Sequence, residues 1–72
     1  MTADNRRGLG SMVKQRRMML QLSLQKLAAE SSVSASHLGR IERGERFPSA
    51  NILRKIAKAL DFEEVELFSQ GH

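Results

Sequence analysis

Residues 22–44 (LSLQKLAAESSVSASHLGRIERG) constrain the fold of this 72-residue chain more than any other segment. Small and apolar residues recur there at the three- and four-residue spacing of one helix face. These residues are Leu24, Leu27, Ala28 and Ser31. Ser23 comes just before them and is suited to cap the first helical turn, so the pattern predicts a short helix over 24–31.

A second helical pattern follows after a short connection. Ser34 is another residue type that caps helices, and Leu38 and Ile41 share one face of the turns after it. Gly44 comes next, a residue type suited to the left-handed conformation that ends many helices. The pattern predicts a helix over 35–43, joined to the first helix by about three residues. Two short helices with such a connection form a helix-turn-helix.

The register of this segment resembles the lambda-repressor/Cro-like family of bacterial helix-turn-helix regulators. The residues that carry the resemblance are Leu22-Ser23, Leu27-Ala28, Val33-Ser34 and Arg40-Ile41-Glu42-Arg43-Gly44. The likeness runs without gaps from Leu9 to Leu67-Phe68, so it covers about 60 residues and is more specific than a lone motif. The family implies a compact all-α domain of five helices, with the helix-turn-helix in helices 2 and 3.

Four positions depart from the family pattern. Leu24 stands where a glutamine that touches DNA is usual, and Ser31 where a core aliphatic residue is usual. Ser32 replaces the usual turn glycine, and Asp61 replaces a helix-ending glycine. A serine in a left-handed turn costs about 1 kcal/mol relative to glycine. The fold is expected to survive these changes more surely than the DNA contacts.

The whole chain is expected to form one helical domain, because no strand pattern appears. The helices are expected over 8–19, 24–31, 35–43, 50–60 and 63–68. Ser49 follows Pro48 and is suited to cap the fourth helix. We expect residues 1–7 to form a disordered basic arm, 8–69 to form the helix-turn-helix domain, and 70–72 to be a frayed end.

An arginine lies among apolar positions of the first predicted helix. Leu9, Val13 and Leu20 share one stripe of that helix with Arg17, which therefore needs a partner. In the family an arginine at this position reaches the glutamate of the Arg-Ile-Glu motif, which here is Glu42. The resemblance implies a bidentate structural ion pair between the two residues, whose role is to orient the second helix of the motif. The alternative is two solvated charges.

The charge is unevenly distributed along the sequence. The net charge is +4, but residues 1–60 carry +8 and the last stretch carries −4. Clustered positive charge suits a nucleic acid, although it would also suit an acidic protein partner. There is no cysteine, no apolar run of roughly 20 residues and no hydrophobic leader, so we expect a soluble, cytoplasmic protein without membrane association.

The resemblance places the helix over 35–43 in the major groove of DNA, with the side on which Gly39 also lies facing outward. The expected base-reading residues are Ala35, Ser36, His37 and Arg40. The Arg40 fork suits O6 and N7 of a guanine, with a phosphate contact as the alternative. His37 is expected to touch a base or sugar, or to be an ordinary surface histidine. A metal site is not expected, because the other histidine is terminal and cysteine is absent.

Phosphate contacts are expected on both sides of this helix. The candidates are Ser23, Gln25, Arg43 and Arg46. Other cations are expected to be solvated and to add only a diffuse field. These are Lys14, Arg16, Lys26, Arg54, Lys55 and Lys58.

These patterns favour a small stand-alone transcriptional regulator that binds a specific double-stranded DNA sequence as a homodimer on a near-palindrome, associated with the nucleoid. The apolar residues of 62–68 would complete the core or contact the second copy. The alternative function is an antitoxin or adaptor whose main ligand is another protein, such as a toxin or another regulator. An enzyme is not expected, because no catalytic set or phosphate loop can be assembled, and no cofactor is implied.

Overall fold

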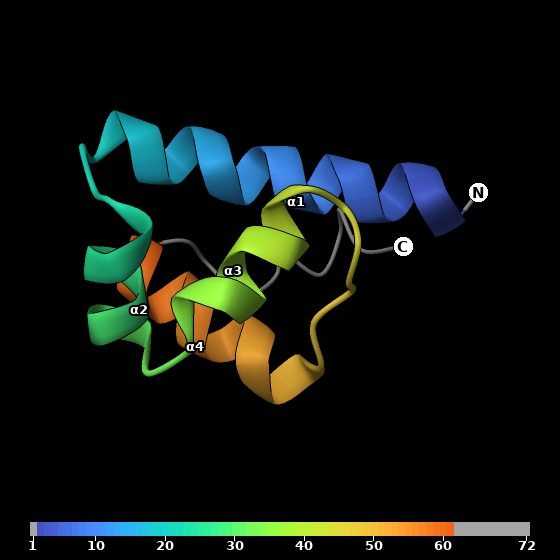
Figure 1. Ribbon diagram of the computed structural model, residues 1–72. Coiled ribbons are helices and arrows are strands. Elements are labelled where there is room, and N and C mark those ends of the chain that lie inside the picture. The colour runs from blue at the N-terminus through green and yellow to red at the C-terminus, as the bar shows by residue number, and fades with distance from the viewer. Residues whose placement is uncertain (1, 62–72) are drawn as a thin grey trace.

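The computed structural model describes the backbone of residues 2–61 and the side chains of residues 8–61. Four helices make up this part: α1 (Thr2–Met19), α2 (Leu24–Ser31), α3 (Ala35–Glu42) and α4 (Ala50–Leu60). In Figure 1, α1 runs along the top of the molecule, α3 lies in front of its middle, α2 lies to the left and α4 lies below and behind α3. α-Helices are thus the only regular secondary structure within residues 2–61, so this part of the chain has the expected all-α fold. The fifth helix expected over 63–68 lies outside the described residues.

Three serines begin three of the helices. The hydroxyls of Ser23, Ser34 and Ser49 each accept a hydrogen bond from a backbone N–H three residues later, at 3.0, 3.1 and 3.3 Å. Each serine has an extended backbone, which is the geometry of an N-cap. These caps confirm the predicted starts of α2, α3 and α4, and the predicted ends of α2 and α4 are also confirmed.

The end of α3 is a Schellman motif centred on Gly44. The Gly44 N–H donates to the Ile41 carbonyl at 3.0 Å, and the Glu45 N–H donates to the Arg40 carbonyl at 2.9 Å. The φ of Gly44 is +76°, the left-handed value expected of this glycine. Arg43 is consequently the C-cap, and α3 ends at residue 42 rather than 43.

Three other helix ends place a residue with a side chain in the left-handed region. Ser32 has a φ of +59°, Asp61 also has +59°, and Gln21 has +58°. Ser32 and Asp61 are the positions at which the family pattern has glycine. Both substitutions therefore keep the turn geometry at a conformational cost of about 1 kcal/mol each.

Helix α1 starts earlier than predicted, but it ends at Met19 as predicted. It begins at Thr2 rather than residue 8, so residues 2–7 continue the helix where a disordered arm was expected. Those residues contain no glycine or proline to stop it. At the other end, the Leu22 N–H donates to the Arg17 carbonyl at 3.0 Å and closes the helix. Leu20 falls just beyond the last turn and is exposed rather than part of the core stripe.

The core lies where α1, α2, α3 and α4 face one another. It consists of Leu9, Val13, Leu27, Val33, Leu38, Ile41, Leu53, Ile56, Ala57 and Leu60. Ser31 is also buried, and its hydroxyl donates to the Leu27 carbonyl at 2.7 Å, so the polar atom that replaces a core aliphatic has a partner.

Gly10 allows α1 to pack closely on the end of α3. A Cβ atom at this position would lie 2.6 Å from the Glu42 carbonyl oxygen and closer still to that of Ile41. Both obstacles are backbone atoms, which cannot rotate away. The crossing of α1 and α3 therefore requires glycine here, and this requirement was missed in the sequence.

Candidate nucleic-acid interface

Helix α3 has one face in the core and one face open. Its buried residues are Leu38, Gly39 and Ile41. On the other side Ser36 and Arg40 are exposed, while Ala35 and His37 are half-buried. The structure thus brings the four candidate base-reading residues together within two turns of one helix, and it places α3 on the near side of the molecule (Figure 1).

Gly39 is the exception on this helix, because it was expected to face outward and is instead buried. The side chain of Arg43 extends back along α3 beside it, so that a Cβ on Gly39 would lie 3.1 Å from Arg43 Nη1. The absence of a side chain at Gly39 makes room for the Arg43 guanidinium against the helix.

Arg17 and Glu42 form a bidentate ion pair that joins the last turns of α1 and α3. Arg17 Nε lies 2.7 Å from Glu42 Oε2, and Nη2 lies 3.0 Å from Oε1. Arg17 Nη1 also donates to the Leu22 carbonyl at 2.8 Å, so the fork holds the loop before α2 as well. The two side chains are 14% and 6% exposed. The hydrogen bonds that Arg17 donates to the Glu42 carboxylate raise the pKa of Arg17, so the guanidinium stays charged.

The start of α2 lies close to this pair. A hollow of about 250 Å³ separates the beginning of α2 from α1 and α3; its lining residues are Lys14, Arg17, Leu24, Gly39, Glu42 and Arg43. Ser23 and Gln25 are exposed beside it, and Leu24 is half-buried. The first residue of α2, Leu24, and Lys14 of α1 therefore line the same hollow as Arg43.

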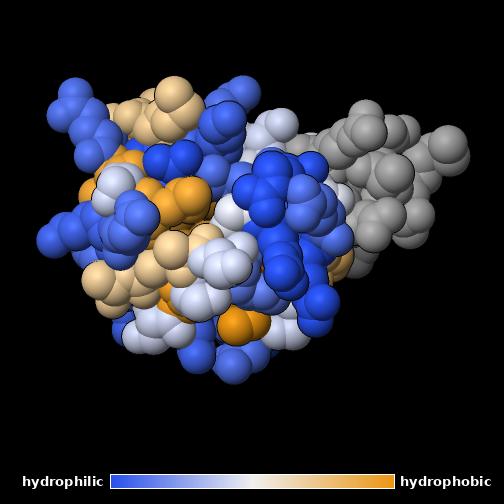
Figure 2. Space-filling model, in the orientation of Figure 1, coloured by the Kyte–Doolittle hydropathy of each residue, from blue (hydrophilic) through white to orange (hydrophobic). Residues whose placement is uncertain are grey.

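The segment between α3 and α4 carries the remaining candidate phosphate ligands. Arg43 and Arg46 are both exposed there. Figure 2 has the orientation of Figure 1 and shows strongly hydrophilic side chains gathered to the right of the centre, on the side where the segment after α3 runs. Arg43 also has a partner that the sequence did not indicate: its Nε lies 2.7 Å from Glu45 Oε2. The hydrogen bond from Arg43 lowers the pKa of the Glu45 carboxyl.

Arg16 has a structural contact that the sequence prediction missed. Its Nε donates to the Leu60 carbonyl at 3.0 Å, and its Nη2 donates to the Asp61 carbonyl at 3.4 Å. An arginine expected to be a solvated cation thus binds the last carbonyls of α4, where the helix dipole favours positive charge. Only the distance in sequence, more than 40 residues, hid this contact.

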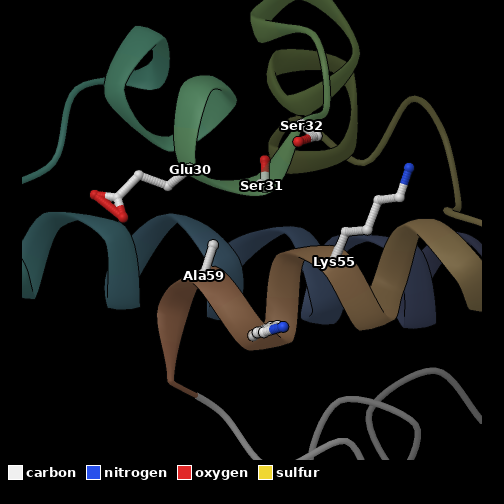
Figure 3. Close-up of a pocket in the computed structure, with 6 residues that line it drawn as sticks. Glu30, Ser31, Ser32, Lys55 and Ala59 are labelled. Carbon is white, nitrogen blue, oxygen red and sulfur yellow. The ribbon is translucent and has the colours of Figure 1, made fainter.

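A second hollow, of about 410 Å³, lies between α2 and α4 and contains no residue of α3. Its lining residues are Glu30, Ser31, Ser32, Lys55, Lys58 and Ala59. In Figure 3 the side chains of Glu30 and Lys55 extend to opposite sides of it. The two lysines lie near the C-terminal end of α2, where the helix dipole attracts cations, so their position is explained without a ligand.

Among residues 8–61 there is no group of three or more histidine, cysteine, aspartate or glutamate side chains able to hold a metal ion. None of the four helices is long and apolar enough to cross a membrane.

Comparison with known proteins places this geometry in a family. Residues 13–67 match the model of a helix-turn-helix family. An uncharacterized HTH-type transcriptional regulator of Mycobacterium tuberculosis is 45% identical over 51 residues, which are 71% of this chain and 36% of the relative. The HTH-type transcriptional regulator SlrR of Bacillus subtilis is 39% identical over 61 residues, which are 83% of this chain and 40% of SlrR. The chain therefore spans less than half the length of these two relatives.

Solved structures agree with the sequence comparison. The restriction-modification controller protein C.AhdI of Aeromonas hydrophila superposes with a TM-score of 0.82 at 36% identity, over 88% of this chain and 96% of C.AhdI. The clp gene regulator ClgR of Corynebacterium glutamicum gives a TM-score of 0.82 at 27% identity, over 93% of this chain and 71% of ClgR. The family match covers more than half of the chain and includes the helix-turn-helix of α2 and α3. This chain belongs to the helix-turn-helix family of lambda-repressor/Cro-like DNA-binding transcriptional regulators.

Proposed function

We propose that this protein binds a specific double-stranded DNA sequence by placing α3 in the major groove. The observation that carries the proposal is the division of α3 into a buried face and an open face, with Ser36 and Arg40 exposed on the open one. A helix held from behind by the core is rigid, and its outer side chains can reach base edges in the groove.

Each open side chain of α3 offers a different contact to DNA. The fork of Arg40 can donate two hydrogen bonds to O6 and N7 of one guanine, which is worth about 1 to 3 kcal/mol of discrimination. Ser36 can donate to or accept from several base edges, and the methyl group of Ala35 can contact a thymine methyl. His37 lies in the first turn of α3 and can contact a base or sugar. Arg40 therefore supplies the sharpest base preference.

In this proposal the ends of α2 and α3 hold the DNA backbone. Ser23 and Gln25 lie at the start of α2, where unpaired backbone N–H groups favour an anion. Arg43 and Arg46 lie just after the C-terminal end of α3. Contacts on both sides of α3 would fix its register in the groove. The Arg17–Glu42 pair sets the angle of α3 relative to α1, and so relative to these contacts.

We further propose that two copies bind a near-palindromic operator. The eight residues of α3 span about 12 Å and read only a few base pairs. A homodimer would place two such helices in successive major grooves, about 34 Å apart, and would gain affinity because the second contact is intramolecular. We place the protein with the DNA in the cytoplasm, as a nucleoid-associated regulator.

Selection of binding sites from random duplex DNA tests this function, with the mass of the protein measured in solution at the same concentration. The expected result is enrichment of paired, inverted half-sites spaced by one helical turn, together with the mass of a dimer. Enrichment of single half-sites by a monomer would remove the dimer from the proposal. A lack of enrichment at low salt, where weak phosphate contacts persist, would contradict DNA reading itself.

Two arginine variants test the placement of α3. Arg40→Ala should relax selection at one base position, because it removes a base contact. Arg43→Ala should weaken binding to all sequences alike and lower the slope of log K against log salt by about one, because it removes a phosphate contact. Identical behaviour of the two variants would show that the docking register is wrong.

A protein-binding function is the second candidate, and one observation favours it. Met18, Met19 and Leu20 are consecutive, and 59%, 73% and 43% of their surfaces are exposed at the end of α1. Adjacent exposed apolar side chains are typical of a protein contact. An antitoxin or adaptor would use this surface for its main ligand. Failure of the DNA selection, together with purification of a stable complex that Met19→Lys disrupts, would favour this function.

A further inference from the structure

The arginine that follows α3 already has an anionic partner within the chain. Arg43 Nε lies 2.7 Å from Glu45 Oε2, and Nη2 lies 3.4 Å from Oε1. The two side chains are 59% and 54% exposed, so solvent and other molecules can reach the pair. The carboxylate therefore faces the same edge of the guanidinium that suits a bidentate phosphate contact.

The position of Arg43 relates this pair to the DNA-facing surface. Its Nη1 group lies against Gly39, and its side chain borders the hollow between α1, α2 and α3. Lys14 and Leu24 line other parts of the same hollow. A phosphate bound near the start of α2 would therefore lie close to the Arg43 guanidinium.

We propose that Glu45 is an internal competitor for DNA, because its carboxylate occupies the guanidinium donors of Arg43 that a backbone phosphate would otherwise accept from. The inference rests on the proposed DNA-binding function and deepens it. Carboxylate and phosphate oxygens both accept charge-assisted hydrogen bonds from arginine, and Nε–H and Nη2–H cannot serve both at full strength. DNA binding then includes an exchange of partners at Arg43.

The charges around the pair indicate that Glu45 competes with a DNA phosphate for Arg43 and does not help Arg43 to bind it. Arg40 also attracts the Glu45 carboxylate, and the pKa of Glu45 is lowered first by its hydrogen bond with Arg43, so it is ionised at neutral pH. Its negative charge stands next to the surface where phosphates would approach, and like charges repel. Exposed ion pairs stabilise a protein little, so the exchange is easy. Glu45 consequently lowers affinity for every DNA sequence and leaves base discrimination unchanged.

The first measurement is the affinity of the full chain for a fluorescein-labelled duplex of random sequence, by anisotropy at low salt. Glu45→Gln should bind about three- to tenfold more tightly than the original protein, because the competitor is removed. Glu30→Gln is the matched control: it makes the same charge change at an exposed residue of α2, away from Arg43. Its gain should stay below about twofold.

A double-mutant cycle separates the pair from general charge. In an Arg43→Gln background, Glu45→Gln should gain no more than Glu30→Gln does. An equal gain with and without Arg43 would overturn the competitor role, because the effect would then be overall charge. Weaker binding by Glu45→Gln would also overturn it, because the carboxylate would then position Arg43 for DNA.

The proposed function and this inference fail in different ways. If the original protein does not bind the duplex at low salt, both are overturned. If it binds, and Arg43→Gln weakens that binding while Glu45→Gln does not strengthen it, only the competitor role is overturned. Circular dichroism of each variant should match the original protein, which shows that the affinities compare folded molecules.

Discussion

The contact between α1 and α3 and the segment after α3 each hold an arginine against a glutamate, with the same Nε–Oε2 distance of 2.7 Å. In the first region the two side chains are 14% and 6% exposed, and in the second they are 59% and 54% exposed. Distance therefore does not distinguish the pairs. Burial does, because losing one partner of a mostly buried pair leaves a charge that water solvates only in part, whereas an exposed arginine is simply hydrated.

The other contacts of each arginine support the same distinction between the two pairs. Arg17 donates to Glu42 and to the Leu22 carbonyl, so its fork joins α1, α3 and the loop between α1 and α2. The side chain of Arg43, by contrast, hydrogen-bonds to Glu45 and lies beside Gly39. The buried pair thus fixes α3 against α1, and the exposed pair is the one for which we propose an exchange of partner with DNA.

Removing the two glutamates in turn should give the largest difference between the regions. Glu42→Ala leaves Arg17 partly buried without its carboxylate, and it should lower the free energy of unfolding by about 3 to 5 kcal/mol. Glu45→Ala should leave that free energy unchanged within error, because Arg43 becomes hydrated. Urea unfolding followed by circular dichroism measures both. Similar losses in the two variants would contradict the distinction made from burial.

Two buried glycines in the described helices, Gly10 and Gly39, allow a second comparison. Gly10→Ala should lower the free energy of unfolding by about 1 to 3 kcal/mol, because the new Cβ meets backbone oxygens of α3. Gly39→Ala should cost less, because its Cβ meets only the movable end of Arg43, and alanine favours a helix more than glycine does. Thermal unfolding of both variants provides the test. A more harmful substitution at Gly39 would show that Arg43 is held more tightly than its exposure indicates.

A substitution in the turn between α2 and α3 should change the free energy of unfolding by a smaller amount. Ser32→Gly should raise the free energy of unfolding by about 1 kcal/mol, because glycine adopts the φ of +59° without strain. The control Ala29→Gly, inside α2, should lower it by about 1 kcal/mol. If both glycines destabilise the protein in urea unfolding, the turn does not carry the strain assigned to it.

The smallest expected effect is a change in the pKa of Glu45. Its pKa in the folded protein lies below the usual value because Arg43 hydrogen-bonds to the carboxylate. The stabilising contribution of the pair is therefore present above the unfolded pKa and is lost as pH falls through the folded pKa. An NMR titration of the side-chain carboxyl carbon should show this depression, and Arg43→Gln should remove it. An unchanged pKa in that variant would show that another group lowers it.

The sequence predicted best those features that neighbouring residues determine. The starts of α2, α3 and α4 were correct because serine caps act within one turn. The left-handed Gly44 is local in the same sense. The Arg17–Glu42 pair came from the family resemblance, and its geometry is the one expected. The DNA contacts assigned to α2 and α3 remain predictions.

The features that were missed depend on residues far apart in sequence or on side-chain direction. The need for Gly10 arises only when α3 lies across α1, although a glycine next to a core leucine inside a helix is a signal of close packing. Arg16 binds carbonyls at the end of α4, which no local pattern indicates. Glu45 is two residues from Arg43, but whether the side chains meet depends on the Schellman turn between them.

An NMR titration of the arginine Nε–H signals with the selected duplex tests whether α3 and Arg43 bind DNA while the Arg17–Glu42 pair stays intact. We predict that the Nε–H signals of Arg40 and Arg43 shift as DNA is added, because one contacts a base and the other exchanges Glu45 for a phosphate. The signal of Arg17 should stay in place, because its buried pair with Glu42 holds α3 before and after binding. A shift of the Arg17 signal with no change at Arg40 and Arg43 would show that DNA does not bind at Arg40 and Arg43 and that the Arg17–Glu42 pair does not stay fixed.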